Sequence, residues 1–299
     1  MPETLADVDA TLRFPQLPSA LMSRRRRLWH RCVLRAISPL RLLGPTNQNA
    51  FGILTYHRVA DGVGPDPAML NVSPTLFRKQ ITGLLRLGYR PLPLRTLIEQ
   101  RENQQRLSSH TFAIVFDDGF YDVYRKAWPI LREFAVPATV FLATRYLDSH
   151  DRFPFDDWSQ DDVETARPLS TLECREMLDS GLIELGSHTH SHEDFRDRPV
   201  AFRADLKESV DTLKANFQIA SPTFSFPYGF TSPELTDIVR DLGLLCALTA
   251  DCQLVTANDD PFQWGRFGAT NLDTASSLAA KLGGWYSTCQ NQWRRARSR

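Results

Sequence analysis

The chain of 299 residues lacks long hydrophobic runs, paired cysteines and an excess of charge of either sign. No apolar stretch approaches the roughly 20 residues that cross a bilayer, so no membrane-spanning helix is expected. Its five cysteines are scattered and form no Cys-x-x-Cys pair, so free thiols are expected and no disulfide framework is indicated. What the chain does have is 42% hydrophobic residues, enough for the core of one large domain.

The 35 basic and 35 acidic residues balance, but the basic ones gather at the two ends of the chain. Residues 1–45 carry a net charge of +5 and residues 294–299 carry +4, so the segment between them is acidic. A nucleic-acid-binding domain would carry its positive face on the folded body, so no nucleic-acid partner is expected. We divide the chain into a basic arm at 1–45, a catalytic domain at 46–290 and a basic tail at 291–299.

The first residues do not follow the pattern of a secretory signal peptide, because the arginines at 24–27 come late and further arginines follow. A cytoplasmic location is therefore expected. Leu28, Cys32, Ala36 and Leu40 recur every four residues, which predicts an amphipathic helix with arginines on its other side. Three interpretations stay open: peripheral contact with the anionic inner face of the membrane, a disordered arm, or a helix that caps the bottom of the folded domain.

Strand-like and helix-like segments alternate along the rest of the chain, which predicts a parallel α/β architecture. Strands are expected at residues 51–57, 112–116, 138–142, 182–187, 245–249 and 263–267. Helices are expected at residues 76–87, 94–100, 121–134, 171–180, 200–217, 232–242 and 275–286. These segments amount to about seven strand–helix pairs.

Two adjacent carboxylates, Asp117 and Asp118, end the apolar run at 112–116 and are followed by Gly119. Successive side chains of a strand point to opposite faces, so both carboxylates can serve one site only if the backbone turns there. Glycine permits such a turn. Carboxylates at the tip of a buried strand are typical of α/β-barrel active sites, although an Asp-Asp-Gly turn alone is also a common way to leave a strand.

Three of the seven histidines lie within residues 188–192, directly after the strand-like run at 182–187. His188 and His192 are four residues apart, so a helical turn would place both rings on one side. One carboxylate and two neutral imidazoles form a ligand set that leaves coordination positions open, as catalytic zinc sites require. The sequence therefore predicts a metal site, formed by these histidines and one of the two aspartates.

These motifs resemble those of polysaccharide deacetylases of carbohydrate esterase family 4, the NodB-homology family. Residues 115–119 resemble its Thr-Phe-Asp-Asp-Gly motif, residues 188–192 its His-Ser/Thr-x-x-His motif, and residues 224–229 its Pro-Tyr-Gly loop. The resemblance spans about residues 49–285 and implies a distorted (β/α)7 barrel in a single catalytic domain. It is nearest to the branch that deacetylates poly-N-acetylglucosamine, through residues 54–59.

The resemblance implies roles for individual residues. Asp118, His188 and His192 would hold a divalent metal ion, with Zn²⁺ expected, and Asp117 would act as the base. The backbone N–H of Tyr228 would stabilise the oxyanion, and Arg266 would pair with the base. A separate set would contact the substrate: Phe226, Pro227, Tyr228 and Trp158.

The general acid departs from the common family pattern, because no histidine follows His192, where typical members carry a Leu-x-His motif. His57 lies in the segment that resembles the poly-N-acetylglucosamine branch, whose N-terminal Tyr-His supplies the acid. We therefore expect His57 to protonate the leaving amine.

The insertion at 145–168 mixes aromatic and acidic residues, and it is either a rim that binds sugar or a self-packed segment. The expected activity is metal-dependent removal of N-acetyl groups from an N-acetylated polysaccharide or lipid-linked glycan precursor. Cleavage of O-acetyl esters on carbohydrate, or sugar binding without catalysis, are the alternatives.

Overall fold

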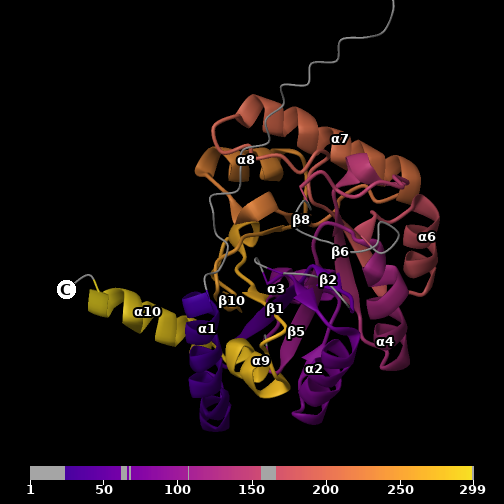
Figure 1. The fold of residues 1–299 in the computed structure, drawn as a ribbon. Helices are drawn as coiled ribbons and strands as arrows, with labels where there is room; N and C mark the ends of the chain where they lie inside the picture. Colours follow the sequence, from indigo (N-terminus) through magenta and orange to yellow (C-terminus); the bar gives the residue numbers. More distant parts are fainter. Residues whose placement is uncertain (1–23, 62–65, 67–68, 107, 156–165, 298–299) are drawn as a thin grey trace, which may run out of the picture.

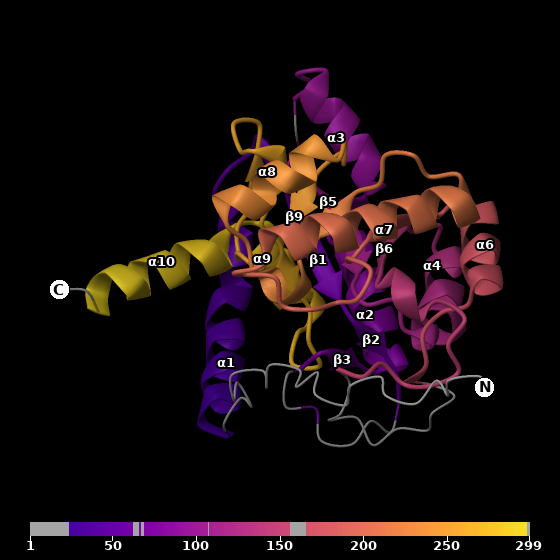
Figure 2. The same ribbon diagram turned by 90° about the horizontal axis from the view of Figure 1, so that it is seen from above.

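The strands form one mostly parallel sheet that curls into a barrel, with helices around it (Figure 1, Figure 2). This architecture is seen in a computed structural model that describes the chain except for residues 1–23, 62–65, 67–68, 107, 156–165 and 298–299. Parallel neighbours follow one another in the order β1, β5, β6, β7, β8 and β9. Their bounds are β1 (Ala50–Tyr56), β5 (Thr111–Phe116), β6 (Ala138–Leu142), β7 (Ile183–Ser187), β8 (Phe224–Ser225) and β9 (Ala247–Leu248).

A seventh segment closes the ring between β9 and β1. Trp264 forms a parallel bridge with Leu248 of β9, and β11 (Phe267–Gly268) pairs in parallel with β1. The predicted seven-membered α/β barrel is therefore confirmed. Regular strand structure covers only the end of the predicted segment at 263–267, because the chain changes partner strand there.

Four further strands are short and lie beside the ring. β10 (Val255–Thr256) is antiparallel to the start of β1, and β4 (Arg90–Pro91) lies parallel to the start of β5. β2 (Arg58–Val59) and β3 (Asn71–Val72) form a separate parallel pair directly after β1. This pair begins at the residue after His57, so the backbone that follows His57 is ordered.

Helices follow the strands close to the predicted bounds. They are α2 (Pro74–Arg86), α3 (Leu94–Glu102), α4 (Trp128–Glu133), α6 (Thr171–Asp179), α7 (Pro199–Phe217), α8 (Pro233–Asp241), α9 (Ala275–Leu282) and α10 (Trp285–Arg297). Capping explains where several begin: the side chains of Ser73, Ser170 and Ser232 each accept a hydrogen bond from a backbone N–H of the first turn.

Two predicted helices differ from the structure for identifiable reasons. The segment at 121–134 contains the π-helical turn η2 (Val123–Ala127) directly before α4. Pro129 is the second residue of α4, and its missing N–H and bulky ring prevent regular α-helical bonding to the preceding turn. The segment at 275–286 breaks at Gly284, which has a φ of 82°. α10 then continues past residue 290 into the predicted basic tail, and it extends away from the barrel in both views (Figure 1, Figure 2).

The N-terminal amphipathic segment is helical and packs on the barrel. α1 (Arg24–Ile37) and the 3-10 helix η1 (Ser38–Leu43) lie against α9, where Leu34 and Ile37 are buried with Ala280 (Figure 1). This packing is nearest to the third interpretation, but Leu28, Cys32 and Ala36 of the predicted apolar side are exposed, so the helix packs through a different side from the one that the four-residue spacing indicated. Within the described part of the chain, no helix is long and apolar enough to traverse a bilayer.

The alternation of side chains along β1 and β5 directs polar groups into one end of the barrel. Phe51 and Ile53 of β1 share a buried cluster with Ala113 and Val115 of β5. Thr55 pairs with Val115 in the register, so the next residues on the same face are His57 and Asp117. The strands therefore place these two polar residues side by side at their C-terminal ends.

A buried ion pair joins α9 to the turn that follows β11. The Lys281 ammonium donates to the Gly268 carbonyl at 2.7 Å and lies 2.8 Å from an Asp273 carboxylate oxygen. Both charged side chains are buried. Removing one partner of such a pair leaves the other charge uncompensated in the interior.

We expect Lys281→Met to lower the free energy of unfolding by about 3 kcal/mol, because it leaves Asp273 buried and unpaired. Urea denaturation of the variant and the parent protein measures this difference. Lys207→Met is the matched control, since Lys207 pairs with Asp211 on an exposed face of α7 and its loss should change little. Equal stability of the two variants would contradict a structural role for the buried pair.

Candidate active site

The two aspartates after β5 face the same site because the backbone is left-handed at Asp118 and Gly119. Asp118 has a φ of 71° and Gly119 one of 83°, and the Gly119 N–H donates to the Asp117 carbonyl at 2.9 Å. A side chain at Gly119 would also collide with Leu142, which lies 2.7 Å from the ideal Cβ position. The turn required by the sequence argument is thus present, and both carboxylates are buried.

Asp118 meets the two predicted histidine ligands. One of its oxygens, Oδ1, lies 3.4 Å from His188 Nε2 and 3.2 Å from His192 Nε2. One ligand atom from each of the three residues lies within 4.8 Å of the others, and all three residues are buried. Two imidazole nitrogens and a carboxylate oxygen that converge in this way have the chemistry of a divalent-metal site.

Hydrogen bonding prepares His188 for such a role. Its Nδ1 lies 2.7 Å from the Ser225 carbonyl, which can only accept, so Nδ1 carries the proton. When the ring is neutral, its lone pair is on Nε2, which faces Asp118, the arrangement typical of a metal-binding histidine. The residues present therefore fit the metal that the motif implies.

The loop at 188–192 is not the helical turn that the spacing of its histidines predicted. Thr189 and His192 are left-handed, with φ values of 66° and 58°. The His192 N–H donates to Thr189 Oγ1 at 3.0 Å, a local bond that replaces the helical one. From α7, the Asp205 carboxylate accepts the backbone N–H groups of His190 and Ser191 at 2.7 and 3.1 Å.

His190 points away from the candidate metal site. Its Nδ1 lies 3.0 Å from the Thr144 hydroxyl, and its Nε2 lies 3.4 Å from a Glu208 carboxylate oxygen. The sequence did not indicate that Asp205 contacts this loop, because Asp205 lies on α7, a separate helix that follows the histidine motif.

His192 is held by aromatic rings. Its ring stacks on Phe155 with centroids 3.9 Å apart, and it meets the Tyr228 ring edge to face with centroids 4.8 Å apart. Its Nδ1 is buried and has no hydrogen-bond partner among the described residues. Phe155 in turn stacks on Phe153, which is buried against Phe120. The described part of the insertion is therefore self-packed and reaches the site through Phe155.

Asp117 is separate from these ligands and pairs with Arg266. The Arg266 Nη1 donates to Asp117 Oδ1 at 2.8 Å and lies 2.7 Å from Oδ2, while its Nε donates to the Thr249 carbonyl at 2.9 Å. His57 Nε2 lies 3.8 Å from Asp117 Oδ2, and the His57 side chain is 24% exposed. This exposure leaves the ring accessible to a ligand.

The surrounding charges keep both carboxyl groups ionised. Burial acts to raise the pKa of Asp117, but the charges of Arg266, His188 and His57 outweigh it and hold the pKa below its usual value. Burial is likewise outweighed at Asp118, where hydrogen bonds from His188 and His192 hold the pKa well below the usual range.

The two histidines respond differently in the metal-free protein. Burial lowers the pKa of His192. Burial also acts to lower the pKa of His188, but the charge of Asp117 and the hydrogen bond to Asp118 raise it overall.

The residues predicted to bind substrate fall into three groups. Phe226 is 1% exposed and packs with Phe202 and Phe224 in the core, so it supports the loop from below and offers no surface to a substrate. Pro227 is also buried. Tyr228 is left-handed, with a φ of 58°, and its ring borders His192. Trp158 lies outside the described residues.

Comparisons with known proteins find similarity to deacetylases. Residues 104–247 match the family described as polysaccharide deacetylase. A poly-beta-1,6-N-acetyl-D-glucosamine N-deacetylase of Staphylococcus aureus is 24% identical over 201 residues, which cover 64% of this chain and 65% of that protein. The protein of the same name from Staphylococcus epidermidis is 24% identical over 244 residues, covering 75% of this chain and 80% of its own length. The chain thus spans about 65% of the Staphylococcus aureus relative.

Solved structures share the fold. The Streptococcus pyogenes deacetylase PplD, in complex with acetate, superposes with a TM-score of 0.67 at 20% identity, over 79% of this chain and 99% of that one. IcaB from Ammonifex degensii gives a TM-score of 0.66 at 23% identity, over 79% and 98%.

We expect Phe155→Ala to weaken the affinity for Zn²⁺ by about tenfold, the lower range for losing a group that orients a metal ligand. Removing the ring frees His192, whose Nδ1 has no hydrogen bond to hold it in place. Competition with a chromophoric chelator measures the affinity. Phe230→Ala is the control, because that ring contacts Tyr228 and not His192. An unchanged affinity in Phe155→Ala, with melting temperatures alike, would show that the loop alone orients His192.

Proposed function

We propose that this protein, which carries a polysaccharide deacetylase domain at residues 104–247, hydrolyses the N-acetyl groups of N-acetylhexosamine units in a glycan. One observation carries the proposal: the Asp118, His188 and His192 triad lies beside a second, non-ligand carboxylate, Asp117, that Arg266 holds in place. The names of the staphylococcal relatives support a polymer of N-acetylglucosamine as the substrate class.

The triad would hold a divalent metal ion, and Zn²⁺ is our choice because a carboxylate and two imidazoles suit it. Such an ion, when bound, polarises a carbonyl group and lowers the pKa of water. The chain itself must position the substrate and move protons at two atoms, the attacking water and the leaving amine.

Asp117 is placed to accept the proton of the attacking water. It is ionised, since its pKa lies below the usual value, and it stays outside the ligand set at 4.0 Å from His188 Nε2. Arg266 fixes the carboxylate through both of its oxygens. A base held in this way needs no rearrangement before it acts.

Tyr228 is placed to stabilise the oxyanion through its backbone. The left-handed conformation at Tyr228 and at Gly229 turns this part of the loop, and a side chain at Gly229 would collide with Ala250. The Tyr228 N–H has no acceptor within the described chain, so it is available as a donor. Burial and the charge of Asp118 raise the pKa of the Tyr228 phenol, which therefore stays protonated.

His57 is the group we assign to protonation of the amine. It follows β1, on the other side of β5 from the two histidines after β7 in the barrel order, and its ring is partly exposed. The backbone that follows it is fixed, because the Asp122 carboxylate accepts from Arg58 Nε at 2.8 Å and from the Val59 N–H at 3.0 Å.

Cytoplasmic location and contact with a membrane stay predictions.

Asp117→Asn should retain stoichiometric metal and lose about 10²–10⁴-fold in turnover, because a base acts on water without holding the ion. Acetate release from N-acetylglucosamine oligomers, together with metal analysis, measures both quantities. Asp118→Asn is the contrasting variant and should lose the metal as well. Activity of Asp117→Asn within about threefold of the parent would eliminate Asp117 as the base.

His57→Ala should bind metal normally and lose N-deacetylation by about 10²-fold or more. Hydrolysis of an activated aryl acetate should fall much less, because its leaving group departs without a proton. The ratio of the two rates is the measurement, and it cancels any loss of folded protein. Equal losses on amide and ester would make His57 a structural residue.

A further inference from the structure

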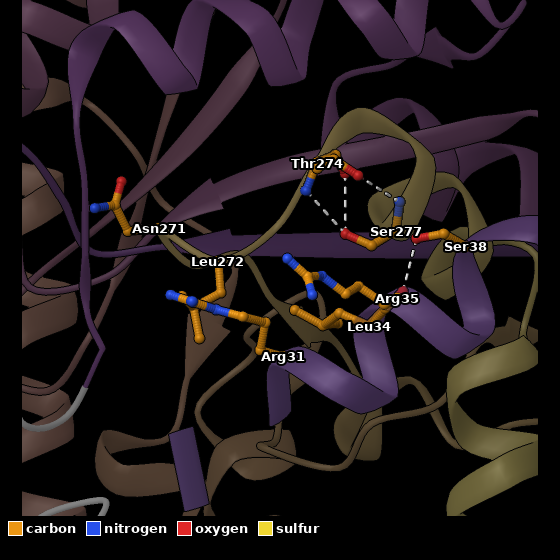
Figure 3. Close-up of a pocket in the computed structure, with 8 residues that line it drawn as sticks. All are labelled: Arg31, Leu34, Arg35, Ser38, Asn271, Leu272, Thr274 and Ser277. Atoms are coloured by element: carbon orange, nitrogen blue, oxygen red, sulfur yellow. Dashed lines mark hydrogen bonds between the residues drawn. The ribbon is translucent and has the colours of Figure 1, made fainter. Parts of the chain in front are cut away.

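A pocket of about 210 Å³ lies between α1 and the first turn of α9, and none of its residues belongs to the candidate active site (Figure 3). One wall comes from α1 and η1, and the other from the turn after β11 and from α9. The lining residues are Arg31, Leu34, Arg35, Ser38, Asn271, Leu272, Thr274 and Ser277.

The lining is positively charged. It contains two guanidinium groups and no carboxylate. Asp273 lies beside these residues in the chain, but it is buried and its oxygens accept from Thr270, Ser277 and Lys281. The Lys281 ammonium compensates the charge of Asp273, so Asp273 does not neutralise the two arginines.

Arg31 and Arg35 are four residues apart on α1, and both are exposed. Like charges at this spacing repel each other. The described chain provides neither of them with an ion pair or a hydrogen bond, whereas exposed Arg203 pairs with Asp241 at 2.8 Å. The close-up shows both side chains reaching along the pocket toward the turn at Leu272 (Figure 3).

Two neutral donors complete the lining. The side-chain oxygen of Asn271 accepts the Ser73 N–H at 3.3 Å, which leaves the Asn271 amide N–H groups uncommitted. The Thr274 hydroxyl accepts the Ser277 N–H at 3.2 Å, and its own proton has no acceptor among the described residues. The positive end of α9 favours an anion in the same place.

The pocket is built on fixed elements. Leu34 and Ile37 anchor α1 against Ala280, and a reciprocal capping box at Thr274 and Ser277 fixes the start of α9. Donors that are already positioned lose little freedom when a ligand binds. Without a ligand, the two guanidinium groups, the Asn271 amide N–H groups and the Thr274 hydroxyl proton have no acceptor in the described chain.

We propose that this pocket binds a phosphate group. Guanidinium groups bind phosphate oxygens in a planar, bidentate manner, and two of them with neutral donors suit a tetrahedral anion. Free phosphate, a phosphorylated glycan and a phospholipid headgroup all present this chemistry. The pocket follows β11 and borders Ser73 after β3, so it lies at the same end of the barrel as the candidate active site.

The test is calorimetric titration of the whole protein with inorganic phosphate at constant ionic strength, which holds non-specific screening fixed. The pocket variant is Arg31→Gln/Arg35→Gln. The matched control, Arg86→Gln/Arg90→Gln, removes the same charge from two exposed positions outside the pocket. The pocket variant should bind phosphate at least about tenfold more weakly, and the control should match the parent protein.

Co-sedimentation with phosphatidylglycerol vesicles, compared with phosphatidylcholine vesicles, distinguishes the sources. Vesicle binding that only the pocket variant loses supports the proposal and identifies a lipid headgroup, whether or not inorganic phosphate binds. Phosphate binding without vesicle binding, lost only in the pocket variant, supports it with a soluble phosphate as the ligand.

The proposal is overturned if the pocket variant and the control behave alike in both arms. Phosphate held at the candidate metal site would give that result, since both variants retain the site. Acetate release from soluble oligomers should be equal in the two variants and the parent protein, so this test does not depend on the proposed deacetylation.

Discussion

The ion pair between Arg266 and Asp117 connects the closure of the barrel to its chemistry. Arg266 lies between Trp264, which bridges to β9, and Phe267, which pairs with β1. Its guanidinium spans from the Thr249 carbonyl to the carboxylate after β5. Since a buried charge that loses its partner is strongly destabilising, the closing segment and Asp117 must be in place together. The position of the Asp117 carboxylate is therefore a consequence of ring closure.

The two histidines of the candidate metal site are supported in different ways. A hydrogen bond to the Ser225 carbonyl at 2.7 Å sets both the tautomer and the direction of the His188 ring. His192 Nδ1 has no such bond within the described part of the chain; its ring stacks on Phe155 and meets Tyr228 edge to face. Aromatic contacts fix the plane of a ring without selecting the protonated nitrogen, so the choice of tautomer at His192 is left to the ion that binds.

The sequence identified what depends on local pattern. Strand–helix alternation predicted the parallel α/β architecture, the family resemblance implied the barrel, and side-chain alternation implied the turn that Asp118 now shows with its φ of 71°. It could not reveal contacts between distant segments, such as Asp205 beneath the histidine loop or Phe155 on His192. The regular four-residue spacing was misleading for His188 and His192, because two left-handed residues and side-chain acceptors replace the helical bonds. Phe226 was expected to contact the substrate because it adjoins the Pro-Tyr-Gly motif, but adjacency to a motif does not determine which side of the backbone faces a substrate.

The candidate site combines two structural sources. The triad and Asp117 lie within residues 104–247, the part that matches the deacetylase family. His57 and Arg266, which both approach Asp117, come from segments on either side of that part, after β1 and before β11. These two strands pair with each other, with Leu54 opposite Phe267. One pairing of chain-distant strands therefore brings the groups that would handle protons to a carboxylate that the family-matched core already provides. The triad on one side, and His57 with Arg266 on the other, should consequently be separable by mutation, because they come from different strands.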